Sequence, residues 1–80
     1  MMDRGILTPH RQRILVLYVV GHSADQIAIM LGTSSSTIRN TLLYIKELLD
    51  LYSRVDLFRW AWGVGLIQEW ASAEFEKVEG

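Results

Sequence analysis

The chain has 80 residues, half of them hydrophobic and only one of them proline, which predicts one small folded domain with a thin core rather than a disordered chain. Its lack of cysteine excludes a disulfide scaffold and a thiolate zinc site and suits a reducing cytoplasm. No apolar run approaches the roughly 20 residues of a membrane span. The net charge is −1, but residues 1–68 carry seven Lys and Arg against five Asp and Glu, so a slightly basic body precedes a tail with four Glu and one Lys.

The first predicted helix runs from Pro9 to about Val20. A frayed lead-in over residues 1–7 precedes it, and Ile6 and Leu7 are the first residues expected to pack. Thr8 is its candidate N-cap, and Pro9 suits the first helical position because its missing N–H costs nothing there. Helical spacing places one apolar face on Ile14, Leu15, Tyr18 and Val19. Gly21 is expected to end the helix.

A second, shorter helix is predicted within residues 23–32. Ser23 with Gln26 three residues later is a capping-box pattern, and Gly32 fits the left-handed position that ends a helix. Its expected buried residues are Ile27, Ala28 and Leu31. Ser34 is a candidate N-cap for a third helix, and two helices joined by so few residues, with glycine at the corner, are typical of a helix-turn-helix.

The third helix, extending to Leu49, is the predicted DNA-recognition helix. Its core stripe consists of Ile38, Leu42, Ile45 and Leu49. Its serine-rich start can approach a groove closely, Arg39 can reach a phosphate or a guanine edge, and Asn40 can pair with adenine. The full predicted DNA-binding set is Ser35, Ser36, Thr37, Arg39, Asn40, Leu43, Lys46 and Arg54. The simpler alternative is that these residues are the solvated face of an ordinary amphipathic helix.

A fourth helix is predicted from Ser53, which forms a capping-box pattern with Asp56, through about Trp62. Its expected core residues are Leu57, Phe58 and Ala61. Trp60 and Trp62 project about 200° apart on a helix, so both cannot face one core. An oligomer interface is the preferred explanation, and the predicted interface set is Val55, Arg59, Trp60, Trp62 and Val64.

The residues after the fourth helix are expected to return to the body of the domain. Gly63 and Gly65 end or weaken the helix, and Leu66 and Ile67 then pack against the core. The chain is therefore divided into a helix-turn-helix domain over residues 1–67 and an acidic tail over residues 68–80. The tail either forms a short extra helix or remains loose, and it is a candidate contact for a protein partner.

The order and spacing of these motifs resemble the LuxR/GerE-type helix-turn-helix domain of bacterial transcription regulators. The fragments that carry the resemblance, without a gap, are Leu7-Thr8-Pro9, Gly21-His22-Ser23, Gln26-Ile27-Ala28, Leu31-Gly32-Thr33-Ser34, Thr37-Ile38-Arg39-Asn40, Leu42, Ile45, Leu49, Ser53-Arg54, Leu57 and Gly65-Leu66-Ile67. The resemblance implies a compact, all-α, four-helix domain that binds DNA as a homodimer. It also implies that the third helix enters the major groove and that the fourth supplies most of the dimer contact.

Several positions depart from that family's pattern. Ser36 stands where Lys is usual, and Glu47 often corresponds to a basic residue. Leu43 and Tyr44 occupy positions that are usually polar or basic, while Arg11 stands where an acid is common. Because a carboxylate repels phosphate and a serine supplies only a neutral hydrogen bond, we expect a weakened DNA-binding face.

The leading hypothesis is a small stand-alone bacterial transcription regulator, cytoplasmic and nucleoid-associated, that binds duplex DNA as a homodimer and uses no cofactor. The alternative is a helix-turn-helix-derived protein-interaction module, an antagonist of another regulator with weak or no DNA binding. An enzyme is not expected, because the chain lacks a Cys nucleophile, a recognisable Ser/His/acid set and a glycine-rich phosphate loop. A metal site is not expected either, since His10 and His22 lack companions at ligand spacing.

Overall fold

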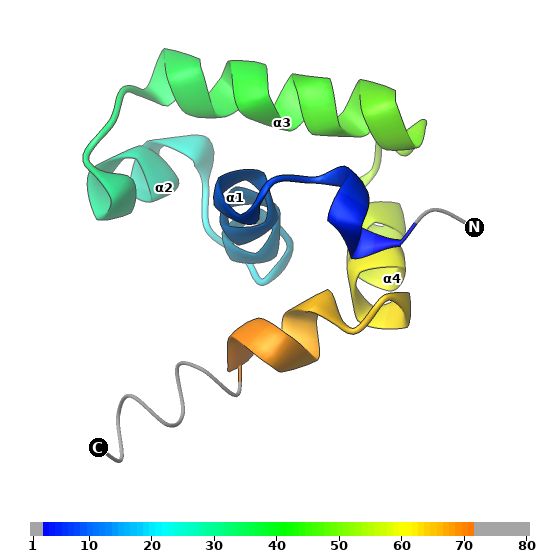
Figure 1. The fold of residues 1–80 in the computed structure, drawn as a ribbon. Coiled ribbons are helices and arrows are strands. Elements are labelled where there is room, and N and C mark those ends of the chain that lie inside the picture. The colour runs from blue at the N-terminus through cyan, green and yellow to red at the C-terminus, as the bar shows by residue number, and fades with distance from the viewer. Residues whose placement is uncertain (1–2, 72–80) are drawn as a thin grey trace, which may run out of the picture.

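The computed structural model describes residues 3–71, and every regular element in that range is helical (Figure 1). A 3₁₀ turn, η1 (Arg4–Ile6), is followed by α1 (Pro9–Val19), α2 (Ala24–Leu31), α3 (Ser35–Leu49) and α4 (Arg54–Gly63), and residues 66–71 are again helical. The predicted all-α, four-helix architecture is confirmed. No helix within residues 3–71 combines the length and apolar composition needed to cross a membrane.

Each of the four α-helices begins at the capping residue that the sequence indicates. A hydroxyl oxygen accepts a hydrogen bond from the backbone N–H three residues later in each case: Thr8 from Arg11, Ser23 from Gln26, Ser34 from Thr37 and Ser53 from Asp56. At Ser23 the capping box is complete, because the Gln26 side chain also accepts the Ser23 backbone N–H at 2.9 Å. Since an N-cap contributes about 1 kcal/mol, these hydroxyls fix four helix starts in a small domain.

The two helices of the helix-turn-helix unit, α2 and α3, both end at a residue in the left-handed conformation. Gly32 has a φ of 70°, and the next N–H, of Thr33, donates to the carbonyl of Ala28 at 2.9 Å. Asp50 ends α3 with a φ of 56°, and the next N–H, of Leu51, donates to the carbonyl of Lys46 at 3.1 Å. Asp is one of the few residues other than glycine that adopts this left-handed region readily. The ends of both helices are therefore determined by the cap residue and by backbone hydrogen bonds close to it in the chain.

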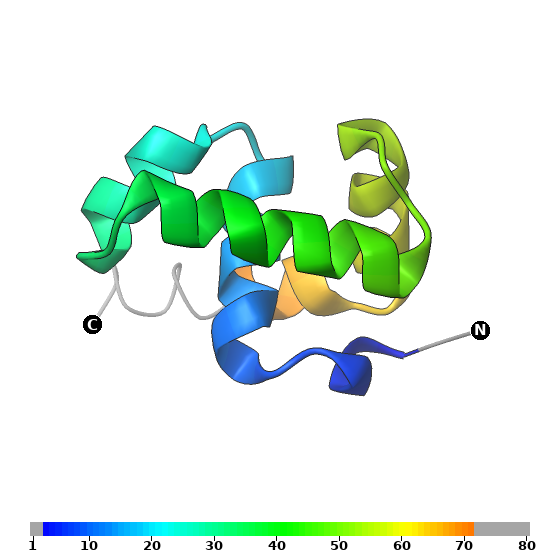
Figure 2. The same ribbon diagram turned by 90° about the horizontal axis from the view of Figure 1, so that it is seen from above.

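Helix α1 lies at the centre of the fold, with α3 crossing it and α2 and α4 on either side (Figures 1 and 2). Its neighbouring residues Ile14 and Leu15 enter two different buried clusters. The α2–α3 cluster comprises Ile14, Ile27, Ala28, Ile38 and Leu42. The α4 cluster comprises Leu7, Leu15, Val16, Val19, Ile45, Leu49, Leu57, Ala61, Leu66 and Ile67. The predicted stripe of α3 is buried in full and is shared between both clusters, which holds α3 against the rest of the domain.

The predicted buried faces of α1 and α2 need three adjustments. Val16, outside the predicted stripe of α1, is buried, because α1 packs against α2, α3 and α4 and so has more than one buried side. Leu31 is only partly buried, since it is the last residue of α2 and lies at the edge of the α2–α3 cluster. Tyr18 is also only partly buried, between the two clusters.

The prediction that Phe58 faces the core is wrong. Leu57 and Ala61, four residues apart, fill the buried stripe of α4, and Phe58 lies about 100° around the helix from Leu57. Phe58 is 38% exposed, and its ring stacks on that of Trp62 with centroids 6.2 Å apart. The outer face of α4 therefore carries an aromatic pair.

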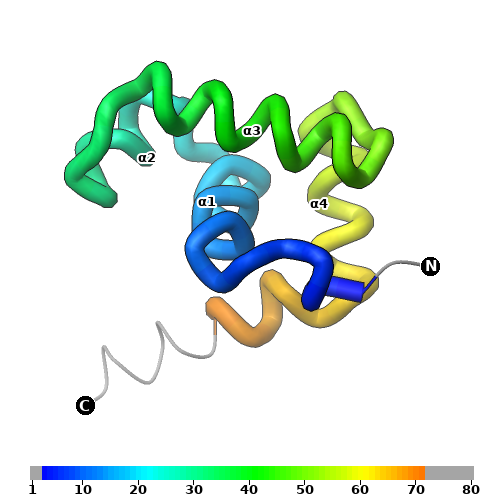
Figure 3. Tube along the Cα trace, turned by 45° about the horizontal axis from the view of Figure 1, so that its top comes forward, coloured from blue at the N-terminus to red at the C-terminus, as the bar shows by residue number. Residues whose placement is uncertain are grey.

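The prediction of a frayed lead-in is also wrong for residues 3–6, which include the 3₁₀ turn η1, whereas the expectation that Leu7 packs is confirmed. Leu7 is buried, and the Arg4 side chain forms an ion pair with Glu69 and donates to the carbonyl of Gly65 at 3.3 Å. Figure 3 shows η1 beside the segment that follows α4. That segment returns to the core as predicted, with Leu66 and Ile67 buried, and its helical stretch continues across the expected division at residue 67.

Candidate nucleic-acid interface

The outward side of α3 is a ridge of exposed residues opposite the buried stripe. At 100° per residue, the centre of this ridge is formed by Ser36, Asn40, Leu43 and Glu47, all of which are exposed. The side chains of Ser36 and Asn40 make no hydrogen bond within residues 3–71. They are therefore free to bind another molecule. We call this surface the α3 ridge.

The first turn of α3 is small and polar, as the sequence indicates, but its hydroxyl groups are not equivalent. The Ser34 and Thr37 hydroxyls lie 2.9 Å apart and form a hydrogen bond with each other. Ser34 also accepts the backbone N–H of Thr37 at 3.2 Å, so this pair serves the helix start. Ser35 is partly buried, whereas Ser36 is exposed. Of the three predicted contacts Ser35, Ser36 and Thr37, Ser36 is the best placed to bind another molecule.

One flank of the α3 ridge gathers three cations from two helices. Arg39 and Lys46 project from the same side of α3, and Arg54 lies at the start of α4. Lys46 and Arg54 both lie over the ring of Tyr18, at 5.5 and 4.2 Å from its centroid. Arg54 also donates to the carbonyl of His22 at 3.4 Å. The structure thus brings Lys46 and Arg54, which are separated in the chain, to one aromatic ring, and Arg39 lies two turns before Lys46 on the same side of α3.

Arg39 is not free on this flank. Its guanidinium lies 3.3 Å from the carboxylate of Asp25, in the first turn of α2, and both side chains are largely exposed. Because an exposed ion pair contributes little to stability, this contact orients Arg39 without holding it strongly. The link runs between the two helices of the helix-turn-helix, and sequence spacing gives no sign of it.

The other flank of the α3 ridge carries a cation that the predicted set omits. The Arg11 guanidinium lies 4.4 Å from the centroid of the Tyr44 ring, which is itself exposed on α3. The basic residues at the start of α1 are the signal that could have placed a cation here. Positive charge therefore lies on both sides of the ridge.

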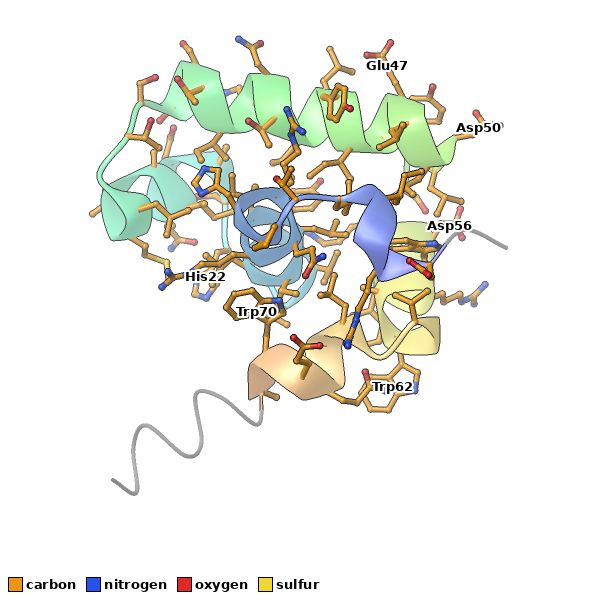
Figure 4. The ribbon with its side chains drawn as sticks, in the orientation of Figure 1. His22, Glu47, Asp50, Asp56, Trp62 and Trp70 are labelled. Atoms are coloured by element: carbon orange, nitrogen blue, oxygen red, sulfur yellow. The ribbon has the colours of Figure 1, made fainter. Side chains whose placement is uncertain are left out.

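Glu47 and Leu43, in the centre of the ridge, are not hydrogen-bond donors: one is a carboxylate and the other is apolar. Glu47 is exposed and makes no ion pair within residues 3–71, and Figure 4 shows its carboxylate pointing away from the body of the domain. Leu43 is 52% exposed. A ligand docked on the outward side of α3 would therefore meet the Glu47 carboxylate and the apolar Leu43 side chain.

The predicted interface residues of α4 fall into two groups. Val55, Arg59 and Trp62 are exposed, whereas Trp60 and Val64 are partly buried and pack against the α4 cluster. The expectation that Trp60 and Trp62 face different surroundings is confirmed, and Figure 4 shows Trp62 at the edge of the molecule. The sequence prediction left out Phe58, although it pairs with Trp62. We call Val55, Phe58, Arg59 and Trp62 the α4 face.

The part of the chain that the structure describes contains no group of three or more His, Asp or Glu side chains arranged to hold a metal ion. The centre of the α3 ridge offers one hydroxyl and one amide, and its flanks offer guanidinium and ammonium groups, all of which donate hydrogen bonds to phosphates and base edges, whereas the Glu47 carboxylate only accepts them.

The family described as sigma-70, region 4 matches residues 6–49, which is more than half of the chain and covers α1, α2 and α3. This match supports a helix-turn-helix DNA-binding domain with a transcription-related function, and it does not specify the LuxR/GerE type. Comparison with curated proteins and with solved structures gives no match.

Proposed function

The chain belongs to the sigma-70 region 4 family, and on that premise we propose that it regulates transcription by binding duplex DNA as a homodimer, with α3 in the major groove. The observation that carries this proposal is the α3 ridge, whose Ser36 and Asn40 have no partner within residues 3–71 and whose flanks bear cations. Donors at the centre can read base edges while flanking cations contact the two phosphate strands. The proposed DNA contacts remain those predicted from the sequence, with Arg11 added.

Residues 50–67 lie outside the family match, and for them the LuxR/GerE-type resemblance supplies the proposal that α4 forms the dimer contact. Support comes from the α4 face, where Trp62 is 53% exposed and stacks with Phe58. Aromatic side chains in such positions are typical centres of protein interfaces. Two copies joined through α4 would present their α3 helices to half-sites about one helical turn apart.

A second candidate function is supported by the centre of the α3 ridge itself. Leu43 and Tyr44 are exposed apolar or aromatic groups, and Glu47 is an unpaired carboxylate within residues 3–71. These three features suit a protein partner better than a phosphate backbone. The chain would then bind another regulator and would have weak or no affinity for DNA.

Titration of a random-sequence duplex pool at two salt concentrations separates these functions. For DNA binding through the four cations of the α3 ridge, log K should fall against log salt with a slope of roughly −3.6 per protomer, since each neutralised phosphate contributes about −0.9. Arg39→Ala should weaken binding about three- to tenfold. Arg13→Ala is the matched control, because Arg13 lies away from α3, and it should change affinity less than about twofold. No binding at low salt would overturn the proposal and favour the protein-interaction module.

A further inference from the structure

The centre and the flanks of the α3 ridge differ in charge and in the contacts that their side chains already make. The centre consists of Ser36, Asn40, Leu43 and Glu47, so it carries no cation. Each of the four cations on the flanks contacts another side chain: Arg39 contacts Asp25, Lys46 and Arg54 contact Tyr18, and Arg11 contacts Tyr44. These contacts hold the cations at the sides of α3, where the phosphate strands would lie.

This arrangement disfavours recognition of guanine at the centre of the ridge. Guanine presents two acceptors in the major groove, O6 and N7, and the side chains that most often bind them are Arg and Lys. Arg39 is the candidate for this contact, but its guanidinium lies 3.3 Å from the carboxylate of Asp25. That carboxylate belongs to α2, which packs on the buried side of α3, so Arg39 is directed away from the centre.

The amide of Asn40 has the hydrogen-bonding groups that adenine requires. It is exposed and makes no hydrogen bond within residues 3–71. An amide offers a donor and an acceptor together, which matches the N7 acceptor and the N6 amino donor of adenine. The two acceptors of guanine or the single amino donor of cytosine would satisfy only half of it.

Leu43 adds an apolar contact beside this amide. It is 52% exposed, and thymine is the only base that presents a methyl group in the major groove. Side chains three residues apart on a helix lie about 5–6 Å from each other, and base pairs are stacked about 3.4 Å apart. Asn40 and Leu43 can therefore reach the same base pair or two neighbouring pairs. Glu47 lies in the last turn of α3, whereas the N-terminal part of a recognition helix contacts base edges.

We propose that the α3 ridge is specific for A·T base pairs, with Asn40 bound to adenine and Leu43 packed on the 5-methyl group of a thymine. This inference rests on the proposed binding of duplex DNA and names the base pairs that the same surface selects. The flanking cations supply affinity that is common to all sequences, because they contact phosphates. Asn40 and Leu43 are then the residues that determine specificity.

The test begins with the selection of duplexes from a random pool by the full chain at low salt. The selected half-sites should share at least one A·T pair, and its replacement by G·C should weaken binding at least about fivefold. Each shared thymine is then replaced by deoxyuridine, which lacks only the 5-methyl group. Fluorescence anisotropy should identify a thymine whose replacement weakens binding about fourfold, the loss expected for one methyl group removed from an apolar contact.

Two substitutions assign these effects to their side chains. Leu43→Ala should reduce the effect of deoxyuridine to less than about 1.5-fold, because the methyl group then has no apolar partner. Met30→Ala is the matched control and should retain the full effect, since Met30 is 51% exposed and lines a hollow to which α3 contributes no residue. Asn40→Ala should abolish the preference for A·T over G·C and change the affinity for unselected duplexes less than about twofold.

The outcomes separate this inference from the proposed function. Selected half-sites that share G·C pairs, or an equal effect of deoxyuridine on Leu43→Ala and on the parent chain, would overturn the inference and leave DNA binding in place. A preference for A·T that persists in Asn40→Ala would also overturn it. If no duplex is retained even at low salt, the proposed function fails, and the inference fails with it.

Discussion

The outer faces of α3 and α4 are both exposed, yet they present different chemistry. The α3 ridge carries a hydroxyl, an amide and a carboxylate, with cations on its flanks. The α4 face carries Val55 and the stacked pair Phe58 and Trp62, with a single Arg59. Since every buried position of both helices is aliphatic, the difference lies entirely in residues that the fold does not require.

That difference is the basis for proposing two kinds of partner for one small domain. Polar donors flanked by cations match the groups of a DNA duplex. Its phosphates attract the cations from a distance, and its base edges form hydrogen bonds with the donors on contact. A stacked aromatic pair gains most when it is removed from water against another apolar surface. In the proposed function, the same scaffold therefore holds a nucleic acid on α3 and a second protein chain on α4.

The largest expected effect comes from removing the support of the α3 ridge. Ile38→Ala empties a fully buried position of the α2–α3 cluster and should lower the free energy of unfolding by about 2–5 kcal/mol. Denaturant unfolding followed by circular dichroism measures this loss. Ile29→Ala is the matched control, because Ile29 is 82% exposed on α2, and it should change stability by less than about 0.5 kcal/mol. Equal effects at the two positions would show that α3 is not held by this cluster.

The second effect concerns the α4 face. Trp62→Ala should weaken dimerisation at least about tenfold, because a central aromatic at an interface typically contributes about 2 kcal/mol or more. Sedimentation equilibrium over a range of protein concentrations measures the monomer–dimer constant. Leu43→Ala, which removes an exposed apolar side chain from α3 instead, should leave that constant unchanged. An unaltered dimer in Trp62→Ala, or a monomeric parent chain, would exclude the α4 face as the dimer contact.

Sequence patterns located the helices well because the determining interactions are local. Thr8, Ser23, Ser34 and Ser53 each bond to a backbone N–H three residues away, and Gly32 needs only its own φ angle. The core stripe of α3 follows from helical periodicity alone. These features could be read without knowing where any other helix lies.

The site was harder to predict because its contacts join different helices. The pairing of Arg39 with Asp25, and the placement of Arg54 over Tyr18, depend on crossing angles that no periodicity encodes. Phe58 was assigned to the core because apolar periodicity cannot distinguish a buried aromatic from one that stacks on its own helix. Sequence reasoning thus named exposed residues of α3 and α4 but could not indicate the contacts that join them to other helices.

A third, smaller effect tests whether Glu47 weakens the α3 ridge. Glu47→Gln removes a carboxylate that would face the phosphates and should raise DNA affinity about two- to fivefold at low salt. The gain should shrink as salt is added, which fluorescence anisotropy at two salt concentrations measures. Asp56→Asn is the control, since that carboxylate is exposed on α4, and it should have little effect. A loss of DNA affinity in Glu47→Gln would contradict this prediction, because it would mean that the carboxylate accepts a hydrogen bond from the DNA rather than repelling its phosphates.

The smallest expected effect concerns the ion pair that joins α2 to the flank of the α3 ridge. Asp25→Asn removes the partner of Arg39, and the exposed pair contributes at most about 1 kcal/mol, so unfolding should change little. A further small loss arises because Asp25 is the only acid in the first turn of α2, where a negative charge favours the helix. The released guanidinium should at the same time bind phosphate more readily, and DNA affinity should rise about twofold. In an Arg39→Ala background, Asp25→Asn should raise DNA affinity less, because there is no guanidinium at position 39 to release. If Asp25→Asn raises affinity equally in both backgrounds, the carboxylate acts only through its charge, and Arg39 is not the residue that it restrains.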